Sequence, residues 1–357
     1  MKILELNFER SWRGGERQTL YNMIGFRNEG HEVALVCRKG CPLEKASSSE
    51  GFKIYSFNNV FGVIYLLVTR GYKFDILHAQ GSGILTYCIL TKPFHGQKVI
   101  FSRRVDFVPK SILTKIKYRK VDKIIAISTA IKQIVSDFCK RDDIDIISDI
   151  AIAKPLNKQR AIVELNKKAV DRGKYIIATV AALVPHKDPF TLIETIRILA
   201  SERQDFVFLH FGNGEMQKAM ETRIAEYNLE SIYILMGFYE DVEDFYSVFN
   251  VFAFTSAQEG LGSSILDAFL YNVPVVSTCA GGIIDIINNE RGLLCPVKDS
   301  ACMAKGINNL LNNNYGDTLV NNAHSYVAKY HSLSYITDQY LQVMRPGLNQ
   351  NDQDLPP

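Results

Sequence analysis

The sequence predicts an α/β protein built from two doubly wound parallel sheets. Short apolar runs rich in β-branched residues alternate with amphipathic segments, which is typical of parallel strands covered by helices on both faces. The alternation stops near residue 152 and restarts near residue 175. A chain of 357 residues with 47% hydrophobic side chains is long enough for two domains with separate cores. We therefore expect a ligand site in a cleft between two domains.

The first domain is expected over residues 1–151. Its strands are expected at KILEL, EVALVC, KIYSF, FDILHA, KVIFS and KIIAIS. The longest apolar run, residues 60–68, has about half of the ~20 residues that cross a membrane, so we expect a core element there. Acidic residues interrupt the apolar N-terminal stretch, which favours a first strand over a signal peptide. The sequence thus predicts a cytoplasmic protein without a membrane-spanning helix.

The second domain is expected over residues 175–330. Residues 152–174 contain a proline and are polar and basic, so we expect a linker there. Strands are then expected at YIIATVAAL, FVFLHFG, IYILMGF, VFAFTS and VPVVST. A last helix is expected over 331–346, and residues 347–357 lack apolar periodicity, which predicts a disordered tail.

Charge is distributed unevenly along the chain. Residues 1–150 carry 24 Lys and Arg against 15 Asp and Glu, whereas residues 151–357 carry 17 against 23. The basic first half suits phosphates, an anionic acceptor or an anionic membrane surface, although a merely solvated basic face fits equally well. The seven cysteines lack the spacing of a metal site, so we expect reduced, mostly buried thiols and no metal.

Two glycine-containing loops invite a comparison with phosphate-binding loops. Gly14 and Gly15 follow the first strand and precede a helix, where the backbone can approach an anion closely, although such a pair is more often only a turn. Gly212 and Gly214 follow a later strand, but Gln217 occupies the third position of a dinucleotide fingerprint. A nicotinamide dehydrogenase is therefore disfavoured.

Lys187 lies between a buried strand and a helix for which Asp188 is the expected N-cap and Pro189 the first residue. Side chains at the carboxyl end of a parallel strand face the crevice where ligands of such sheets bind. Lys187 is therefore a candidate anion contact, although a lysine in a loop is ordinarily just solvated.

The most informative stretch is AQEGLGSSILDAFLYNVPVVSTCAGG, residues 257–282. Glu259 is expected in the loop at the carboxyl end of a strand. The amides of Gly262, Ser263 and Ser264 open the next helix and suit a phosphate or diphosphate. Asp267 lies one turn further along the same helix face. On its own this pattern also fits a turn-capping Glu259 and a solvated Asp267.

The stretch and its surroundings resemble the signature segment of retaining GT-B glycosyltransferases of family 4, the glycosyl transferases of group 1. That signature has two acidic residues separated by seven, then a Pro-Val-Val strand and a Gly-Gly turn. VAALVPHKD and RGLLCPVKD extend the likeness in the second domain, and RGGERQTL and FDILHAQ extend it more thinly in the first. The resemblance implies two Rossmann-like domains facing across a cleft, an acceptor-side domain at 1–151, a nucleotide-sugar-binding domain at 175–330, and a C-terminal helix that packs back on the first domain.

The resemblance also implies roles for individual residues. These are Gly14 and Gly15 facing the donor phosphates and acceptor, His78 in the acceptor-side active centre, Lys187 on the diphosphate, Glu259 near the donor sugar, and Asp267 on the ribose.

The chain departs from the family pattern at two positions. Ala182 stands where an arginine is usual, so one phosphate contact is missing, and Arg103 and Arg104 are candidate replacements from the first domain. Asp267 stands where glutamate is usual, and its side chain is one methylene shorter. The nucleotide preference is therefore open.

We expect a retaining, metal-independent glycosyltransferase without a cofactor, which moves a sugar from a nucleotide-diphosphate sugar to a hydroxyl of a glycan or lipid-linked acceptor. The resemblance favours lipopolysaccharide, capsule or other cell-envelope glycans. Peripheral contact with an anionic membrane is expected, and nucleic acid is not an expected partner. The alternatives are a nucleotide-sugar epimerase or phosphorylase on the same fold and a non-catalytic nucleotide-sugar-binding protein. The acidic triplet at Asp143 and Asp145 is common by chance and is not assigned to a metal.

Overall fold

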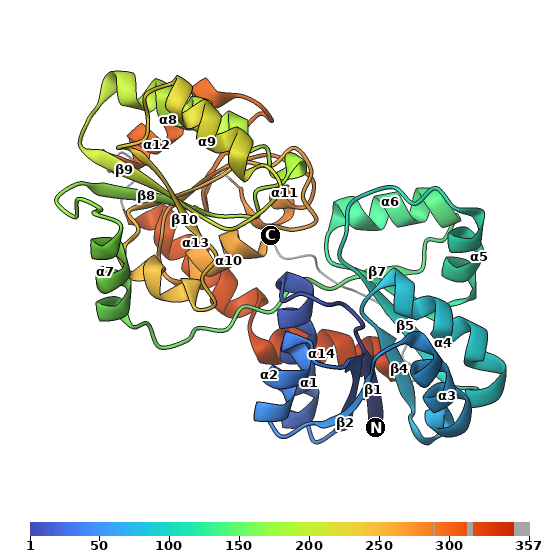
Figure 1. Ribbon diagram of the computed structural model, residues 1–357. Coiled ribbons are helices and arrows are strands. Elements are labelled where there is room, and N and C mark those ends of the chain that lie inside the picture. Colours follow the sequence, from blue (N-terminus) through green and yellow to red (C-terminus); the bar gives the residue numbers. More distant parts are fainter. Residues whose placement is uncertain (289, 313–316, 346–357) are drawn as a thin grey trace. The chain divides into compact units, whose positions relative to one another are not determined.

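The computed structural model describes residues 1–288, 290–312 and 317–345 and divides the chain into two compact units. Among the described residues, unit 1 comprises Met1–Ile150 together with residues 330–345, and unit 2 lies within Ala151–Lys329. Each unit is built on one parallel sheet with helices on both faces, which confirms the predicted fold class (Figure 1). The tail expected at 347–357 lies outside the described residues.

Unit 1 has a seven-stranded sheet in the order β3-β2-β1-β4-β5-β6-β7, in which every neighbouring pair is parallel. The strands are β1 (Lys2–Leu6), β2 (Glu32–Arg38), β3 (Lys53–Phe57), β4 (Ile76–Ala79), β5 (Lys98–Arg103), β6 (Lys123–Ala126) and β7 (Ile144–Ile146). The strand order reverses between β1 and β4, and ligands of doubly wound sheets bind at such a switch point. The six expected strands are present, and β7 is an addition.

The helices of unit 1 form two layers, with α1, α2 and α14 on one face of the sheet and α3 to α6 on the other (Figure 1). They are α1 (Gly14–Asn28), α2 (Pro42–Ser49), α3 (Val60–Arg70), η1 (Gly71–Lys73), α4 (Ser82–His95), α5 (Ile112–Lys120), α6 (Thr129–Cys139) and α14 (Leu333–Met344). Helix α14 packs against α1, so the end of the described chain completes the first layer.

Helix α3 corrects the expectation of a core element at residues 60–68. Val63, Leu66 and Leu67 are buried, but Phe61 and Tyr65 are 76% and 70% exposed. The run is therefore an amphipathic helix whose outer face is aromatic, because only one side of a helix in an outer layer can reach the sheet.

Unit 2 has a six-stranded parallel sheet in the order β10-β9-β8-β11-β12-β13. Its strands are β8 (Tyr175–Val180), β9 (Phe206–Phe211), β10 (Tyr233–Gly237), β11 (Val251–Phe254), β12 (Val275–Thr278) and β13 (Leu293–Cys295). Its helices are α7 (Lys158–Lys167), η2 (Pro185–Lys187), α8 (Pro189–Glu202), α9 (Gln217–Glu226), η3 (Val242–Val248), α10 (Ser263–Leu270), α11 (Ile283–Ile286), α12 (Ser300–Leu311) and α13 (Thr318–Tyr330). The segment 152–174, where a linker was expected, contains α7, which packs against η3. The five expected strands are present, and the short β13 is an addition.

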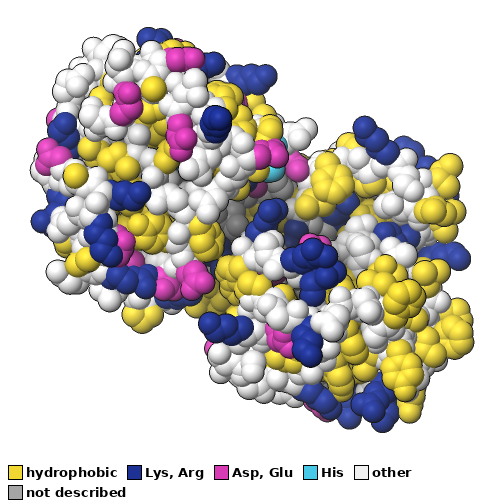
Figure 2. Space-filling view, in the orientation of Figure 1, with side chains coloured by type: hydrophobic (Ala, Val, Ile, Leu, Met, Phe, Trp, Pro, Cys, Tyr) yellow, Lys and Arg dark blue, Asp and Glu magenta, His cyan; other side chains and the backbone are white. Residues whose placement is uncertain are grey.

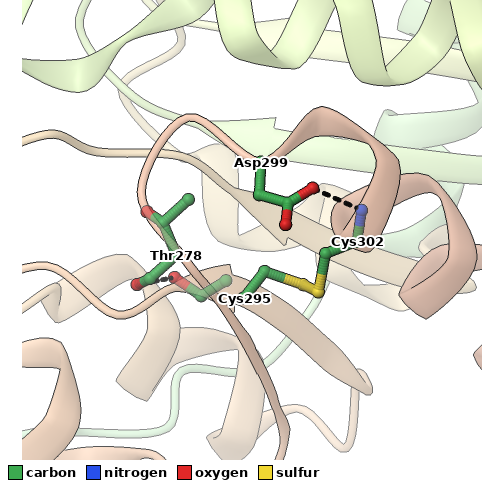
Figure 3. The surroundings of a disulfide bond; sticks show 5 residues. Thr278, Cys295, Asp299 and Cys302 are labelled. Carbon is green, nitrogen blue, oxygen red and sulfur yellow. Dashed lines mark hydrogen bonds between the residues drawn. A yellow bond between two sulfur atoms is a disulfide. The ribbon is translucent and has the colours of Figure 1, made fainter.

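Two cysteines correct the expectation of reduced thiols. Cys295, the last residue of β13, forms a disulfide with Cys302 in the first turn of α12 (Figure 3). Asp299 caps α12 by accepting a hydrogen bond from the Cys302 backbone amide at 2.9 Å. The disulfide therefore links β13, the edge strand of the sheet, to the capped start of α12. Of the described free cysteines, Cys279 is exposed and the others are buried.

Candidate functional site

Lys187 and Glu259 meet at the carboxyl edge of the unit 2 sheet. Lys187 ends η2 after β8, Glu259 lies in the loop after β11, and β8 and β11 are neighbouring strands. The Lys187 ammonium donates to Glu259 Oε2, and the hydroxyl of Ser256 donates to the same oxygen at 3.1 Å. The two charged side chains are 19% and 12% exposed. A charge pair that retains contact with solvent can exchange one partner for a ligand.

Backbone hydrogen bonds join the two loops that carry this pair. The amides of Ala257 and Gln258 donate to the carbonyl of His186 at 2.9 and 3.3 Å. The Thr255 hydroxyl donates to the carbonyls of Lys187 and Asp188 at 3.2 and 3.0 Å. The position of Lys187 relative to Glu259 is therefore fixed by the backbone as well as by the ion pair.

The Gly-Gly turn after β12 supports the Glu259 loop from the other side. The amide of Gly282 donates to the Glu259 carbonyl at 3.0 Å. Gly281 has φ +50°, and a Cβ at that position would lie 2.1 Å from the same carbonyl oxygen. Glycine is required here because any side chain would push the Glu259 loop away.

Helix α10 begins directly after this loop. Its N-cap is Gly262, with φ +96° and no side chain to accept from the first amides. Ser263 and Ser264 are partly exposed, and Asp267 is 9% exposed one turn further along. The first turn of α10 thus offers amides to an anion beside Lys187 and Glu259.

The Gly212 and Gly214 pair has a packing role. A Cβ at Gly212 would lie 2.0 Å from the carbonyl oxygen of Ala181, and one at Gly214 would lie 2.1 Å from that of Leu183. The glycines let the loop after β9 press against the loop that leads to Lys187. Ala182, at the position of the missing arginine, is exposed on that loop.

His210 lies beneath the same loop, in β9. Its Nδ1 accepts from the Tyr233 hydroxyl at 2.8 Å, and its Nε2 faces the Ala181 carbonyl at 3.3 Å. Burial lowers the pKa of His210 to about 4. The ring is therefore a neutral support for the loop at neutral pH.

In unit 1, Gly14 and Gly15 form the first turn of α1. Glu16 closes a capping box, because its carboxylate accepts from the backbone amide of Arg13 at 2.9 Å. Burial raises the pKa of Glu16. A Cβ at Gly15 would lie 3.8 Å from Arg104 Cδ, so the start of α1 and Arg104 lie at the same edge of this sheet.

His78 lies in β4 and is fully buried in a polar cluster. Its Nδ1 is 2.6 Å from Glu5 Oε1, and its Nε2 is 2.8 Å from the Ser102 hydroxyl. Gln80 donates to the other Glu5 oxygen at 2.8 Å. Both ring nitrogens of His78 are thus engaged inside unit 1.

Arg104 and Tyr340 extend the cluster toward the C-terminal helix. Arg104 forms an ion pair with Asp149, and their side chains are 10% and 6% exposed. The Tyr340 hydroxyl of α14 lies 3.3 Å from the Ser102 hydroxyl and 3.4 Å from Arg104 Nη2. Sequence reasoning did not single out Asp149 or Tyr340, because only the tertiary fold brings them beside β5.

Arg103, the last residue of β5, and Arg104, which follows it, contact different parts of unit 1. Arg103 is 1% exposed. It donates to the Tyr118 hydroxyl at 2.6 Å and to the Phe107 carbonyl. Both guanidinium groups are therefore engaged within unit 1, that of Arg104 by Asp149, but only Arg104 has its side-chain stem beside Gly15.

The acidic triplet is also occupied by structural contacts. Asp143 pairs with Arg141 at 2.6 Å, and Asp145 pairs with Lys123 at 2.8 Å. Among the described residues, no group of three or more His, Cys, Asp or Glu side chains could hold a metal ion. No helix within the described ranges is long and apolar enough to span a bilayer.

Comparison with known proteins identifies the class. The solved structure of Anabaena Alr3699/HepE in complex with UDP superposes with a TM-score of 0.83, covering 96% of this chain and 99% of that chain at 17% identity. Residues 163–329 match the family model described as "Glycosyl transferases group 1", and residues 12–149 match that described as "Glycosyltransferase Family 4". The two units thus form a glycosyltransferase fold of the GT-B type. The chain belongs to the family-4 glycosyltransferases.

Curated relatives agree with this assignment. The lipopolysaccharide core biosynthesis glycosyltransferase LpsE of Rhizobium meliloti is 26% identical over 65% of this chain and 66% of its own length. The capsular polysaccharide biosynthesis glycosyltransferase CapM of Staphylococcus aureus is 26% identical over 56% of this chain and 55% of its own length. The matched part therefore spans about half to two thirds of these relatives.

Proposed function

We propose that the protein transfers a sugar, with retention at the anomeric carbon, from a nucleotide-diphosphate sugar to a hydroxyl of a glycan or lipid-linked acceptor. The observation that carries the proposal is the Lys187–Glu259 pair beside the uncapped first turn of α10. A nucleoside diphosphate leaves with growing negative charge, and a lysine with helix amides can stabilise that charge without a metal.

The pair suggests how the donor would enter the site. In the free protein Lys187 is held by Glu259 and is 19% exposed. A diphosphate carries more negative charge than one carboxylate, so it would draw Lys187 away from Glu259. Glu259 would then be free to accept hydrogen bonds from the donor sugar, while Ser256 retains one of its oxygens. Asp267 would contact the ribose from the next turn of α10.

Unit 1 would supply the acceptor side. Gly14, Gly15 and Arg104 would face the donor phosphates and the acceptor. The buried His78 would keep the strands beneath them in position through its contacts with Glu5 and Ser102. By the names of LpsE and CapM, we favour an acceptor in lipopolysaccharide, capsule or another cell-envelope glycan, reached from the inner face of the membrane.

The test is a thermal-shift screen of nucleoside diphosphates and their sugars, followed by incubation of the stabilising donor with and without lipid-linked or soluble glycan acceptors. We expect one base to stabilise the protein, and transfer to require an acceptor and to conserve the donor's anomeric configuration, measured by NMR. Donor isomerisation without an acceptor would instead indicate an epimerase, and release of a sugar phosphate in the presence of phosphate would indicate a phosphorylase. Binding without any turnover would indicate a non-catalytic protein.

A further inference from the structure

The two helix layers of unit 1 differ in what they expose. In the described residues of α1, α2 and α14, no large hydrophobic side chain is exposed. On the opposite layer, α3 exposes Phe61 and Tyr65, and α4 exposes Leu90 and Phe94 at 64% and 65%. Each pair is spaced by four residues, so each forms an outward stripe on its helix.

Helix α5 extends this surface, and its aliphatic side chains face outward and not toward the core. Ile112, Leu113 and Ile116 are 74%, 76% and 46% exposed, whereas Tyr118 is its one buried residue. Surface helices normally turn their apolar face to the core. An outward apolar face of this kind indicates that another apolar phase covers it.

The loop between β5 and α5 adds to the same surface. Val105, Phe107 and Val108 are 42%, 59% and 60% exposed. The loop follows Arg104 directly, so this apolar segment lies at the carboxyl edge of the unit 1 sheet, where the acceptor is expected. Figure 2 shows hydrophobic side chains along the side of unit 1 that carries α3, α4 and α5, with lysine and arginine side chains among them.

The charge of the segment is predominantly positive. Residues 105–121 contain a single acidic residue, Asp106, and five basic ones: Lys110, Lys115, Lys117, Arg119 and Lys120. The basic residues of the last turn of α5 are exposed except Lys117, which is directed to Ser82. Apolar side chains flanked by lysine and arginine match the interface of a bilayer with anionic headgroups.

We propose that the segment 105–120, continued by the outer stripes of α3 and α4, docks unit 1 onto an anionic phospholipid bilayer. Ile112 and Leu113 enter the acyl boundary, and Lys110, Arg119 and Lys120 contact the headgroup phosphates. A second copy of the chain is the less suitable occupant, because a symmetric contact would oppose like charges. The inference rests on the proposed function to the extent that a lipid-linked acceptor would be presented at this surface.

The test is co-sedimentation of the full chain with vesicles of phosphatidylglycerol and phosphatidylcholine in equal parts, and with phosphatidylcholine alone. We expect binding to the anionic vesicles that weakens as salt rises. The double variant I112S/L113S removes two exposed apolar side chains without touching the core, and we expect its binding to fall at least ~10-fold at every salt concentration. The double variant K110E/K120E should lose binding at low salt by a similar factor and differ little from the wild type at high salt.

The matched control is V163S/K168E in unit 2, where Val163 is 43% exposed on α7 and Lys168 is the C-cap of that helix. It should bind vesicles as the wild type does. Absence of binding by the wild type at low salt, or equal binding by I112S/L113S and the wild type, would overturn the proposal. So would light scattering that finds a wild-type dimer and a monomeric I112S/L113S, because the surface would then join two copies. Thermal stabilisation by nucleoside diphosphates is measured in the wild type and in each variant. Its absence in all of them, the wild type included, would count against the proposed function and not against docking.

Discussion

The carboxyl edges of the two sheets both hold clusters of hydrogen-bonded polar and titratable side chains, but the clusters differ in access to solvent. In unit 1, Glu5 and His78 are fully buried, and Tyr340 of α14 reaches their Ser102 partner. In unit 2, Lys187 and Glu259 retain exposures of 19% and 12%. A buried cluster fixes geometry because each partner is costly to leave unpaired, whereas a partly open pair can give up one partner to a ligand. Substitutions should therefore act mainly on stability in unit 1 and mainly on binding and turnover in unit 2.

The largest effect is expected for Arg104→Met, which leaves the Asp149 carboxylate buried without its cation. The free energy of unfolding should fall by about 3–5 kcal/mol, measured by urea denaturation. The double variant Arg104→Met/Asp149→Asn should recover part of this loss, because no unpaired charge remains. If both variants are as stable as the wild type, the Arg104–Asp149 pair does not stabilise unit 1.

In unit 2, Lys187→Met and Glu259→Gln should each reduce sugar transfer at least ~100-fold with little change in the melting temperature. The two should differ in nucleoside diphosphate affinity, measured by calorimetry. Lys187→Met should weaken it, because a charge-assisted contact is lost. Glu259→Gln should preserve or increase it, because Lys187 no longer has a competing carboxylate. Near-normal turnover in both variants would refute the assignment of this pair to the active site.

A smaller effect is expected from pH through His210. Its folded pKa of about 4 lies below the ordinary value of 6.5, so the neutral ring stabilises the fold fully above pH 6.5, and this contribution is lost as the pH falls toward 4. Between pH 7 and 5 the loss should be about 2 kcal/mol in the free energy of unfolding. His210→Gln keeps a donor and an acceptor but does not titrate, so its stability should fall less over that interval. If the free energy of unfolding falls equally with pH in the wild type and in His210→Gln, then other groups dominate the loss of stability in acid.

The sequence predicted eleven of the strands because they are continuous apolar runs, the pattern of strands buried on both faces. It missed β7 and β13, each three residues long, because so short a run has no periodicity to detect. The outward faces of α3 and α5 were missed for another reason. Apolar residues are assigned to the core by default, and only the packing shows which way Phe61 or Leu113 points.

The candidate site was predictable where it depends on local order along the chain. Glu259, Gly262 and the start of α10 follow from strand, loop and helix in sequence, and Asp188 caps α8 as expected. The contacts of Lys187 with Glu259 and of Arg104 with Asp149 join residues 72 and 45 positions apart. Such pairings depend on strand order, which the sequence pattern alone does not specify. The different partners of Arg103 and Arg104 likewise depend on the tertiary fold around β5.

The position of α14 has a consequence for how the protein is made. Unit 1 begins before unit 2 in the sequence, yet the helix that covers α1 and brings Tyr340 to Ser102 follows unit 2. Unit 2, residues 151–329, leaves the ribosome before that helix does. The N-terminal unit is therefore the last to complete its core, in contrast to the usual N-to-C order of domain folding. During synthesis, α1 therefore stays uncovered by α14 until residues 333–344 have been translated.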